Sequence, residues 1–502
     1  MKKKRRMMLC GIMILIMALA MAMPVSVSAE VDDNDVARIG DQGYDTLSAA
    51  VASVAEGGEA EITLLKTVTG ASTVRISEGK DITIDLNGND IGFSENQRFN
   101  VIGGKLTLTG TGTVREESPY YAPVMMAGSA EDVADYSVVN VGEGVTLTGW
   151  AGLFINQNNG SDYGIVANVY GTLNSVRDTT GADGHALYIN GQIKVTEGNN
   201  VPKITLEEAT LNAESGTGMY LAGYAETVIN DSTITSSAEG GTGIEIRAGK
   251  ISITDSTVSG GMGEPETDPN GNGVTSINTA LSVAQHTTKL PIEVTVTNSS
   301  FNGGAAFSQQ NPQNNGEEDI EKVSLDLQSG NFNGQVYSEN KTDFISSGTF
   351  SDPVNADYIK DSMIEISFKS GETTRYHVGN QEQINEIVKV AASGDKIEVI
   401  QGDVDLTVPA GGVGVSNSGS GAVTVNDEPV TDDIVITEEP EPTTPTDPTE
   451  PGNTDPTGNT AAGSGATATG DDTNLTLMFV IMGLAAAAAA GTVVYGRKKR
   501  HN

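Results

Sequence analysis

The sequence predicts an all-β solenoid, a fold in which short strands wind into stacked coils. Two observations predict it. Strand-like segments of similar composition recur along residues 200–352, and each carries two apolar residues five positions apart with polar, turn-forming residues between them. Such recurrence is typical of a solenoid, because each unit buries its apolar side chains only by stacking on its neighbours.

Six of these segments align without gaps. They are ITLEEATLN from Ile204, TVINDSTIT from Thr227, ISITDSTVS from Ile251, VTVTNSSFN from Val294, LDLQSGNFN from Leu325 and DFISSGTFS from Asp343. Their third residues are all apolar, namely Leu206, Ile229, Ile253, Val296, Leu327 and Ile345. Their eighth residues are apolar as well, namely Leu211, Ile234, Val258, Phe301, Phe332 and Phe350.

The offset of five residues indicates a corner within each segment. Successive side chains of a straight strand point to opposite faces, so two residues five apart would lie on opposite sides of it. Both can point inward only if the chain bends between them, where Asp, Asn, Ser and Gly suit a tight turn. Each segment therefore predicts one coil, repeated every 23 or 24 residues where no loop is inserted. Two wider spacings contain the polar stretches MGEPETDPNGNGVTSINT and NPQNNGEEDIE, which predict outward loops.

A second strand pattern interleaves with the first. It comprises GHALYIN from Gly184, GTGMYLAG from Gly216, GTGIEIRAG from Gly241 and NTALSVAQ from Asn278. The combined pattern resembles the right-handed parallel β-helix of the pectin-lyase-like superfamily over about residues 60–352, which implies roughly ten to twelve coils. A β-sandwich is the alternative fold, with antiparallel hairpins at shorter, even intervals and no repeated corner.

The first 29 residues have the layout of a secretory signal. Five basic residues, Lys2 to Arg6, precede a short apolar run broken by Pro24, and the small residues after it predict cleavage between Ala29 and Glu30. An uncleaved N-terminal anchor is the weaker alternative, because the apolar run is short. Cys10, the only cysteine, lies in this leader, so the exported chain has no disulfide and no thiol nucleophile.

The exported part of the chain is strongly acidic. Nine of the 29 Lys and Arg residues and two of the 66 acidic residues lie in the leader or after residue 470. Residues 30–470 therefore carry a formal charge of about −44, which excludes nucleic acid and argues against anionic lipid as partners.

A short helix is expected at the start of each of two folded parts. Within residues 30–59, Leu47, Ala50, Val51 and Val54 have helical spacing, and a strand follows around Ile62 to Leu65; this predicts an N-terminal cap for the solenoid of residues 60–363. The pattern returns with Ile384, Ile387, Val388 and Ala391, followed by a strand from Ile397 to Ile400. Residues 364–437 are therefore predicted to be a small α+β or β module.

The remaining C-terminal residues predict a spacer and an anchor. Residues 438–470 are rich in Pro, Thr, Gly and acids and cannot bury enough apolar surface to fold, so they are expected to be a disordered, extended spacer. In residues 471–502, Leu475 to Tyr495 is an uncharged run that as a helix would span ~31 Å, about one bilayer core. The basic residues that follow favour a cytoplasmic C-terminus, with the N-terminus outside; they are Arg497, Lys498, Lys499 and Arg500.

The stretch GSGATATGDDTN before this run resembles the LPxTG sorting signal of Gram-positive wall proteins. The matching positions are Ala466, Thr467, Ala468, Thr469 and Gly470. In that family a sortase cysteine attacks the Thr–Gly bond and the Thr carbonyl passes to a peptidoglycan amine. Leu and Pro of the motif are absent here, so two interpretations stay open: a degenerate sorting signal that is cut after Thr469, and a retained membrane helix.

No catalytic constellation emerges from the sequence. Lyases and hydrolases of the β-helix superfamily need a base beside clustered acids, or paired acids on adjacent coils. Arg177 and Arg247 stand alone rather than in the paired arginine motif of pectate lyases. His185 in GHALYIN lacks the partners that such enzymes place around it and is interpreted as a turn or surface histidine. Asp231, Asp255 and Asn298 share one repeat position. They are interpreted as turn-forming ladder residues rather than as a carboxylate site.

Neither a metal nor a cofactor is expected. Asp268, Asn270, Asn272 and Gly273 match the start of a calcium-loop pattern, but Thr279 replaces its final Glu, so a solvated acidic loop is expected instead. Aromatic residues make up 5% of the chain and Trp150 is its only tryptophan, which offers few platforms for sugar rings.

The expected function is that of a surface protein of a Gram-positive bacterium, anchored at the wall or membrane, with a role in adhesion, ligand display or surface structure and without catalysis. Expected partners are peptidoglycan or membrane at the C-terminus, sortase, and a glycan or protein of the host or environment. A tethered polysaccharide lyase or glycoside hydrolase is the alternative function.

Overall fold

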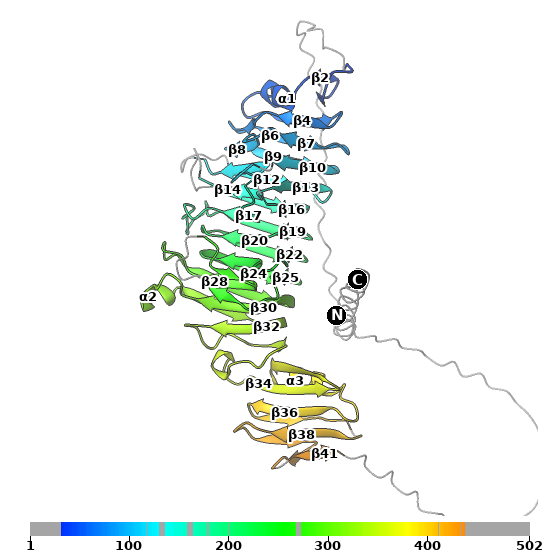
Figure 1. Cartoon of the computed structure of the whole chain (residues 1–502), viewed down its shortest axis with the longest axis vertical. Helices are drawn as coiled ribbons and strands as arrows, with labels where there is room; N and C mark the ends of the chain where they lie inside the picture. The colour runs from blue at the N-terminus through cyan, green and yellow to red at the C-terminus, as the bar shows by residue number, and fades with distance from the viewer. Residues whose placement is uncertain are drawn as a thin grey trace, which may run out of the picture. The chain divides into compact units, whose positions relative to one another are not determined.

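The computed structural model describes residues 32–436, except residues 117, 130–135, 158–163, 178–179, 199, 268–272, 410 and 432. Over these residues the chain is all-β, and most strands lie in long parallel sheets, an arrangement compatible with a β-helix (Figure 1). The predicted leader, spacer, sorting signal and membrane anchor lie outside the described residues.

Three parallel ladders of strands form a stack of coils, which we call the coil stack. The first ladder contains β3 (Glu59–Leu64), β6 (Asp81–Asp85), β9 (Lys105–Thr109), β12 (Ser137–Val141), β15 (Ile165–Val169), β18 (Lys203–Glu207), β21 (Glu226–Asn230), β24 (Gly249–Thr254), β29 (Ile292–Thr297) and β31 (Val323–Leu327). The second contains β4 (Val68–Ala71), β7 (Ile91–Phe93), β10 (Gly112–Glu116), β13 (Val145–Gly149), β16 (Thr172–Ser175), β19 (Thr210–Ala213), β22 (Thr233–Thr235), β25 (Thr257–Ser259), the first parts of β30 (Ser299–Gln310) and β32 (Gly330–Ser338), and β33 (Gly348–Phe350). The third contains β5 (Val74–Ile76), β8 (Phe99–Ile102), β11 (Val124–Ala127), β14 (Ala151–Ile155), β17 (Gly184–Ile189), β20 (Gly216–Leu221), β23 (Thr242–Ile246), β28 (Thr279–Ala284) and the second parts of β30 and β32.

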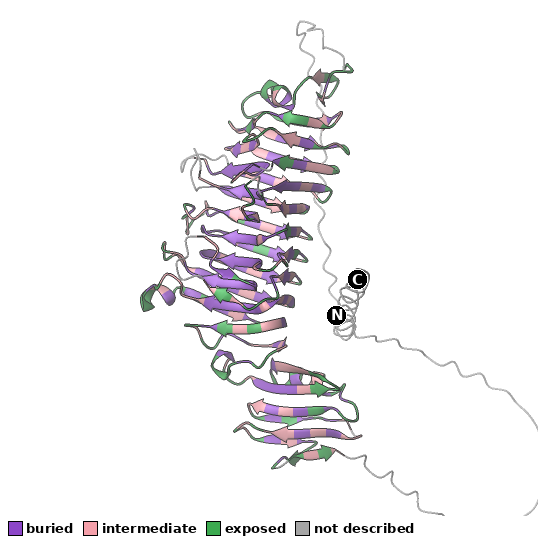
Figure 2. Ribbon diagram, in the orientation of Figure 1, coloured by how far each residue is buried: buried purple, intermediate pink, exposed green. Residues whose placement is uncertain are grey.

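The paired apolar residues of the sequence repeat form the core of this stack. All twelve have no exposed surface. On the first ladder, Leu206 pairs with Ile229 and Ile229 with Ile253 in parallel register. On the second ladder, Phe301 pairs with Phe332 in the same way. Figure 2 shows buried residues running through successive strands, with exposed residues gathered in the turns. The parallel register excludes the β-sandwich alternative for these segments.

The predicted corner is a single residue in the left-handed backbone region. Asp231, Asp255 and Asn298 have φ values of 45°, 49° and 47°. Asp and Asn tolerate this conformation better than other non-glycine residues, because their short side chains can bond locally to the backbone. The interpretation of these three residues as turn-forming is therefore consistent with their backbone geometry, and the Asn298 side-chain amide donates to the Asp255 carboxylate.

A serine follows each of these corner residues and ties successive coils together. The Oγ atoms of Ser232, Ser256 and Ser299 each donate to a backbone carbonyl two residues earlier, at 2.6, 2.7 and 2.9 Å. The same Oγ atoms accept the backbone N–H of the preceding coil's corner, with Ser256 accepting from Ser232 and Ser299 accepting from Ser256 at 3.1 Å each. These buried hydroxyls thus satisfy backbone groups that the bend removes from the ladders.

The coil stack begins with the helix that the sequence predicts. Strands β1 (Ala37–Ile39) and β2 (Gln42–Tyr44) form a hairpin, and α1 (Leu47–Ser53) follows it. The Thr46 hydroxyl accepts the N–H of Ala49 at 3.1 Å and caps the helix. Leu47, Ala50 and Val51 are buried in the core.

Residues 364–436 repeat this starting unit. The strands β34 (Ile364–Ser370) and β35 (Thr373–Gly379) form a hairpin, α3 (Gln381–Val388) follows, and β36 (Lys396–Gln401) pairs antiparallel with β34, as β3 pairs with β1. Beyond it lie β37 (Val404–Leu406), β38 (Val413–Asn417), β39 (Val423–Val425), β40 (Glu428–Pro429) and β41 (Ile434–Ile436). Parallel pairing of β36 with β38 and of β37 with β39 makes two further, smaller turns of chain.

The hairpin β34–β35 joins the two parts through a buried polar seam. Strand β35 pairs antiparallel with β33, the last strand of the second ladder. Glu365 on β34 is only 1% exposed, and burial raises its pKa to about 7. His377 on β35 lies 3.1 Å from the Thr349 hydroxyl, and burial together with the nearby Arg375 lowers the pKa of His377 to about 4.

Replacing a core residue of the coil stack should destabilise the protein strongly. The substitution Ile253→Ala removes buried methyl groups from a side chain packed between Ile229 and Val296, and should lower the free energy of unfolding by about 2–5 kcal/mol. Urea unfolding followed by circular dichroism measures the change. The matched control is Ser252→Ala, on the outward side of the same strand, which should change it by less than about 0.5 kcal/mol. Equal effects of the two substitutions would contradict the inward orientation.

The seam should make stability depend on pH. Burial raises the pKa of Glu365 above 4.5, the ordinary pKa of a glutamate. The stability that the buried, protonated carboxyl allows is therefore fully present below pH 4.5 and is lost as the pH rises through 7. Glu365→Gln should therefore stabilise the protein at pH 8, by about 2 kcal/mol, and have little effect at pH 4.5. Melting temperatures at the two pH values test this. Glu372→Gln, at the exposed turn of the same hairpin, is the control, and a pH-independent effect of Glu365→Gln would contradict the assignment.

Candidate functional site

The longer loops of the coil stack gather at the ends of the third ladder. Connections from the first to the second ladder are one to five residues long throughout. Longer ones either enter a strand of the third ladder, as at residues 176–183 and 260–278, or leave one, as at residues 190–202 and 311–322. The short helix α2 (Glu317–Ile320) lies in the last of these loops and stands out at the edge of the stack in Figure 1. Functional residues concentrate on loops carried by a rigid scaffold, so this face is the candidate site.

The outward side chains of the third ladder form one continuous row. From coil to coil the row contains Met125, Phe154, Tyr188, Tyr220, Glu245, Ser282, Ser308 and Tyr337. Its first half is apolar and its second half is polar until the last position. The Phe154 and Tyr188 rings stack with centroids 4.5 Å apart, and the Tyr188 and Tyr220 rings stack at 5.4 Å.

Trp150 lies at the centre of an aromatic cluster over the first half of this row. Its ring makes edge contacts with Tyr120, His185 and Tyr188 at centroid distances of 5.3, 5.2 and 5.9 Å. Its indole N–H donates to the carbonyl of Asp183 at 2.9 Å. We call Tyr120, Tyr121, Trp150, His185 and Tyr188 the aromatic patch.

The patch is partly open to solvent. Tyr120 is 64% exposed and Trp150 is 6% exposed, while Tyr121, His185 and Tyr188 are intermediate. Tyr120 has a φ of 63°, a left-handed conformation that is rare for an aromatic residue and costs energy. Such strain persists where the surrounding structure holds it. Here two backbone hydrogen bonds hold the flanking chain. The Ala151 N–H donates to the Tyr121 carbonyl at 3.1 Å, and the Phe99 N–H donates to the Pro123 carbonyl.

A polar rim borders the patch. Asp183 accepts a hydrogen bond from Ser215 at 2.5 Å and forms an ion pair with Arg177 at 2.9 Å; both charged side chains are about half exposed. Burial of the imidazole lowers the pKa of His185 to about 3, although Asp183 acts in the opposite direction. His185 is therefore neutral near pH 7. Its buried Nδ1 has no hydrogen-bond partner within the described part of the chain.

The second half of the row is covered by the end of the loop at residues 260–278. This loop carries a small hairpin of β26 (Glu266–Thr267) and β27 (Ser276–Ile277). The Glu245 carboxylate, with no exposed surface, accepts the N–H groups of Thr275 and Ser276 at 2.9–3.0 Å. Arg247 donates to the Gly273 carbonyl at 2.6 Å and lies 3.9 Å from Glu245. Burial raises the pKa of Glu245, while Arg247 and the loop donors favour its charged form.

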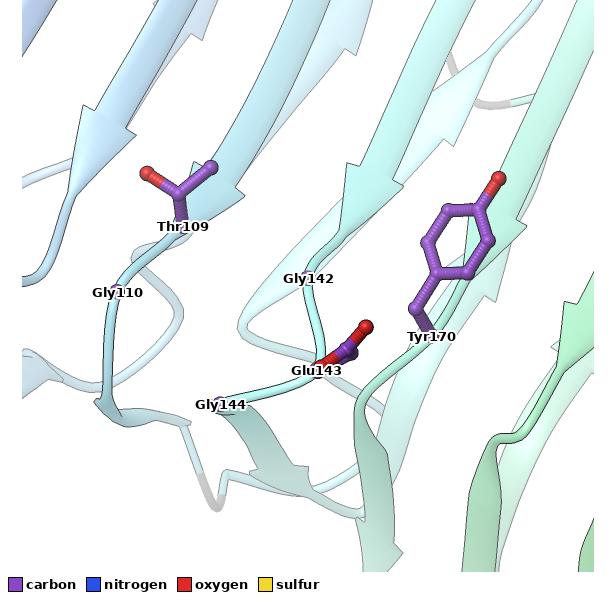
Figure 3. Close-up of a pocket in the computed structure, with 6 residues that line it drawn as sticks. All are labelled: Thr109, Gly110, Gly142, Glu143, Gly144 and Tyr170. Atoms are coloured by element: carbon purple, nitrogen blue, oxygen red, sulfur yellow. The ribbon is translucent and has the colours of Figure 1, made fainter. Parts of the chain in front are cut away.

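A shallow depression lies elsewhere, over the corners between the first and second ladders. It has a volume of about 340 Å³ and is lined by Thr109, Gly110, Gly142, Glu143, Gly144 and Tyr170 (Figure 3). It is hollow because glycine corners stack closely: a Cβ on Gly144 would lie 2.4 Å from the Gly110 carbonyl oxygen. Apart from Thr109, only Glu143 and Tyr170 bring polar side-chain groups to this depression, because its other lining residues are glycines. It therefore offers fewer groups for binding a ligand than the aromatic patch.

The structure corrects the interpretation of one residue. His185 is not in a turn; it lies on β17 and packs between Trp150 and Tyr220. Arg247 lies beside Glu245, a neighbour that the sequence analysis did not name. The predicted outward loop of residues 260–278 turns back at its end, where Thr275 and Ser276 are buried.

The other sequence-predicted positions have no role in this site. Arg177 belongs to the rim, whereas Asp231, Asp255 and Asn298 lie at the corners between the first and second ladders, away from the third. Asp268, Asn270 and Asn272 of the calcium-like pattern lie outside the described residues, and Thr279 begins β28. The signal cleavage site, the sorting positions, the apolar run and the basic tail also fall outside the described part of the chain.

Sequence reasoning missed the aromatic patch. Its members come from residues 120 to 188 and meet only because consecutive coils stack. A usable signal existed in the aligned strands GHALYIN and GTGMYLAG, where Tyr188 and Tyr220 occupy one outward position.

Within residues 32–436, as described, no group of three or more His, Cys, Asp or Glu residues is placed to hold a metal ion. No helix among the described residues is long and apolar enough to cross a bilayer. No protein-family model, no curated protein and no solved structure matches this chain.

Removing the buried carboxylate beside Arg247 should be costly. Glu245→Ala leaves the guanidinium without its counter-charge and the loop N–H groups of Thr275 and Ser276 without an acceptor, so it should lower the free energy of unfolding by about 3–5 kcal/mol. Chemical denaturation measures this. Glu239→Ala removes an exposed acid from the adjacent corner and serves as the control, with an expected change under about 0.5 kcal/mol. A small effect of Glu245→Ala would show that the pair does not hold the loop.

Proposed function

We propose that this chain is a bacterial surface protein whose coil stack displays a ligand-binding face for adhesion and does not catalyse a reaction. The single observation that carries the proposal is the placement of the longer loops, over the described residues, at the ends of the third ladder, whose outer side carries the aromatic patch. Loops of varied length on one side of a regular scaffold are typical of a recognition surface. The corners between the first and second ladders are short, and hydrogen bonds satisfy their backbone groups at Ser232, Ser256 and Ser299. Such corners suit a rigid support.

The proposal includes the finer identity of the fold and the means of attachment. We propose that the coil stack is a right-handed parallel β-helix of the pectin-lyase-like type, exported by the N-terminal leader and held outside the cell by the C-terminal segment. Mass spectrometry of C-terminal peptides from isolated walls separates the two modes of attachment. Thr469 joined to a peptidoglycan cross-bridge indicates sorting by a sortase, and an intact peptide through Tyr495 indicates a membrane helix.

A tethered polysaccharide lyase or hydrolase is the second candidate function. The observation that favours it is the meeting of Tyr220, Glu245 and Arg247 on adjacent coils of the same face. Glu245 and Arg247 have no exposed surface, however. Glu245 accepts the Thr275 N–H, Arg247 donates to the Ala284 carbonyl at 3.0 Å, and the two side chains form an ion pair at 3.9 Å. Steady release of unsaturated or reducing products from uronic-acid or mucin-type glycans would favour this candidate.

Display of the chain should make cells adhesive. Cells producing the full chain should bind to immobilised host or environmental glycans and proteins more than cells that lack it, because the coil stack presents its loop-bearing face outward. Adhesion is measured by counting retained cells under flow. The matched control ends at residue 470, lacks the anchor segment and should release the protein into the medium. Equal adhesion with and without surface display would contradict an adhesive role.

A further inference from the structure

The aromatic residues on the outer side of the third ladder are not required by the coil geometry. The outward row of the first ladder has the same spacing, yet it is polar at every position but one, namely Thr83, Thr107, Asn140, Asn168, Thr205, Val228, Ser252, Thr295 and Asp326. An outward row can therefore be hydrophilic in this stack. The rings of Phe154, Tyr188 and Tyr220 occupy an outward row without serving the coil core.

We propose that the aromatic patch binds a neutral saccharide, with Tyr120 as the stacking platform and the rim of Arg177, Asp183 and Ser215 as hydrogen-bonding partners. This deepens the proposed function and rests on it, because it names the ligand class of the displayed face. A pyranose ring has an apolar C–H face and hydroxyl groups around its edge. It therefore suits an aromatic surface that is bordered by polar groups.

The geometry of the patch supports a ligand rather than simple packing. Tyr120 is 64% exposed and holds a strained backbone, so it contributes little to burial at an energetic cost. The Nδ1 atom of His185 is buried beside Trp150 and has no hydrogen-bond partner among the described residues. Strain and an unpaired polar atom in one place are typical of a functional site.

Charge favours a neutral saccharide over an anionic one. Residues 30–470 carry a net charge of about −44, which repels polyanions. Within the patch, Arg177 is already paired with Asp183 at 2.9 Å, and Arg98 lies over the Tyr121 ring at 4.8 Å. These cations are therefore engaged with groups of the protein itself.

Trp150 provides a site-specific measurement, because it is the only tryptophan of the chain. The full chain, solubilised in a detergent without a sugar headgroup, is titrated with cellohexaose, maltohexaose, mannohexaose, chitohexaose and hexagalacturonate while tryptophan fluorescence is recorded. At least one neutral hexasaccharide should give a saturable change. Its affinity should be the same at low and high salt, since the ligand carries no charge.

Variants of Tyr120 test the platform. Tyr120→Ala should weaken binding roughly tenfold, the loss expected for one aromatic contact, and Tyr120→Phe should retain it. Tyr120→Gly should lose binding without a lower melting temperature, since glycine adopts the left-handed conformation freely. The matched control is Tyr337→Ala, an exposed tyrosine in the same outward row on a distant coil, which should leave binding unchanged.

Three results would overturn the inference. Binding of hexagalacturonate alone would contradict the neutral ligand class while leaving the displayed-face proposal intact. Binding of a protein but of no saccharide would assign the patch to another class of partner. No fluorescence change with any hexasaccharide, in a protein that still mediates cell adhesion, would remove the saccharide site but not the proposed function. Loss of adhesion itself in the cell assay would instead reject the proposed function.

Discussion

The alignment of inward apolar side chains from coil to coil is the constraint on which the rest of the structure depends. In each strand the faces alternate, so a slip of one residue would turn the whole inward set toward solvent. The corner residue in the left-handed region fixes this register, because it lets side chains five apart enter one interior. In three coils the serine after the corner residue accepts a backbone N–H from a neighbouring coil; these serines are Ser232, Ser256 and Ser299. Coils of different sequence thus stack with Leu206, Ile229 and Ile253 in line.

The features that repeat along the chain could be predicted from the sequence, because they depend on local geometry. The apolar pair, the polar corner and the two helices all follow from spacing within about ten residues, and the structure confirms the twelve core residues and both helices. The aromatic patch depends instead on which residues of different coils share an outward position. That position varies from coil to coil, so the only sequence signal was the recurrence of Tyr188 and Tyr220 at one position of two aligned strands. The pair of Glu245 and Arg247 was not named from the sequence either, although a spacing of two residues places both on one face of a strand.

Inward and outward positions therefore carry different information. Substitution at an inward position disturbs the neighbours above and below, so these positions are confined to apolar residues of similar size. Outward positions of the third ladder can change from Tyr220 to Glu245 between adjacent coils while the inward Leu221 and Ile246 stay paired. The scaffold can thus support a binding face without alteration of its core. Loops at the two ends of the third ladder can also vary in length with little loss of folding stability, because the entropy cost of closing a loop grows slowly with its length.

The two halves of the outward row also set the size of the displayed surface. On one side the Glu245–Arg247 pair holds the end of the 260–278 loop over the polar half, so that Thr275 and Ser276 cover it. On the other side Met125 begins the apolar half, and four coils at ~4.8 Å each separate it from the covered region. The open aromatic surface is accordingly short along the stack, and its rigid rings lose little conformational freedom on binding. A ligand held only there would contact the protein over a few sugar rings. Under the proposed adhesive function, strong attachment of a cell depends on many copies of the chain acting together, since linked weak sites gain affinity by raising the effective concentration of the next one.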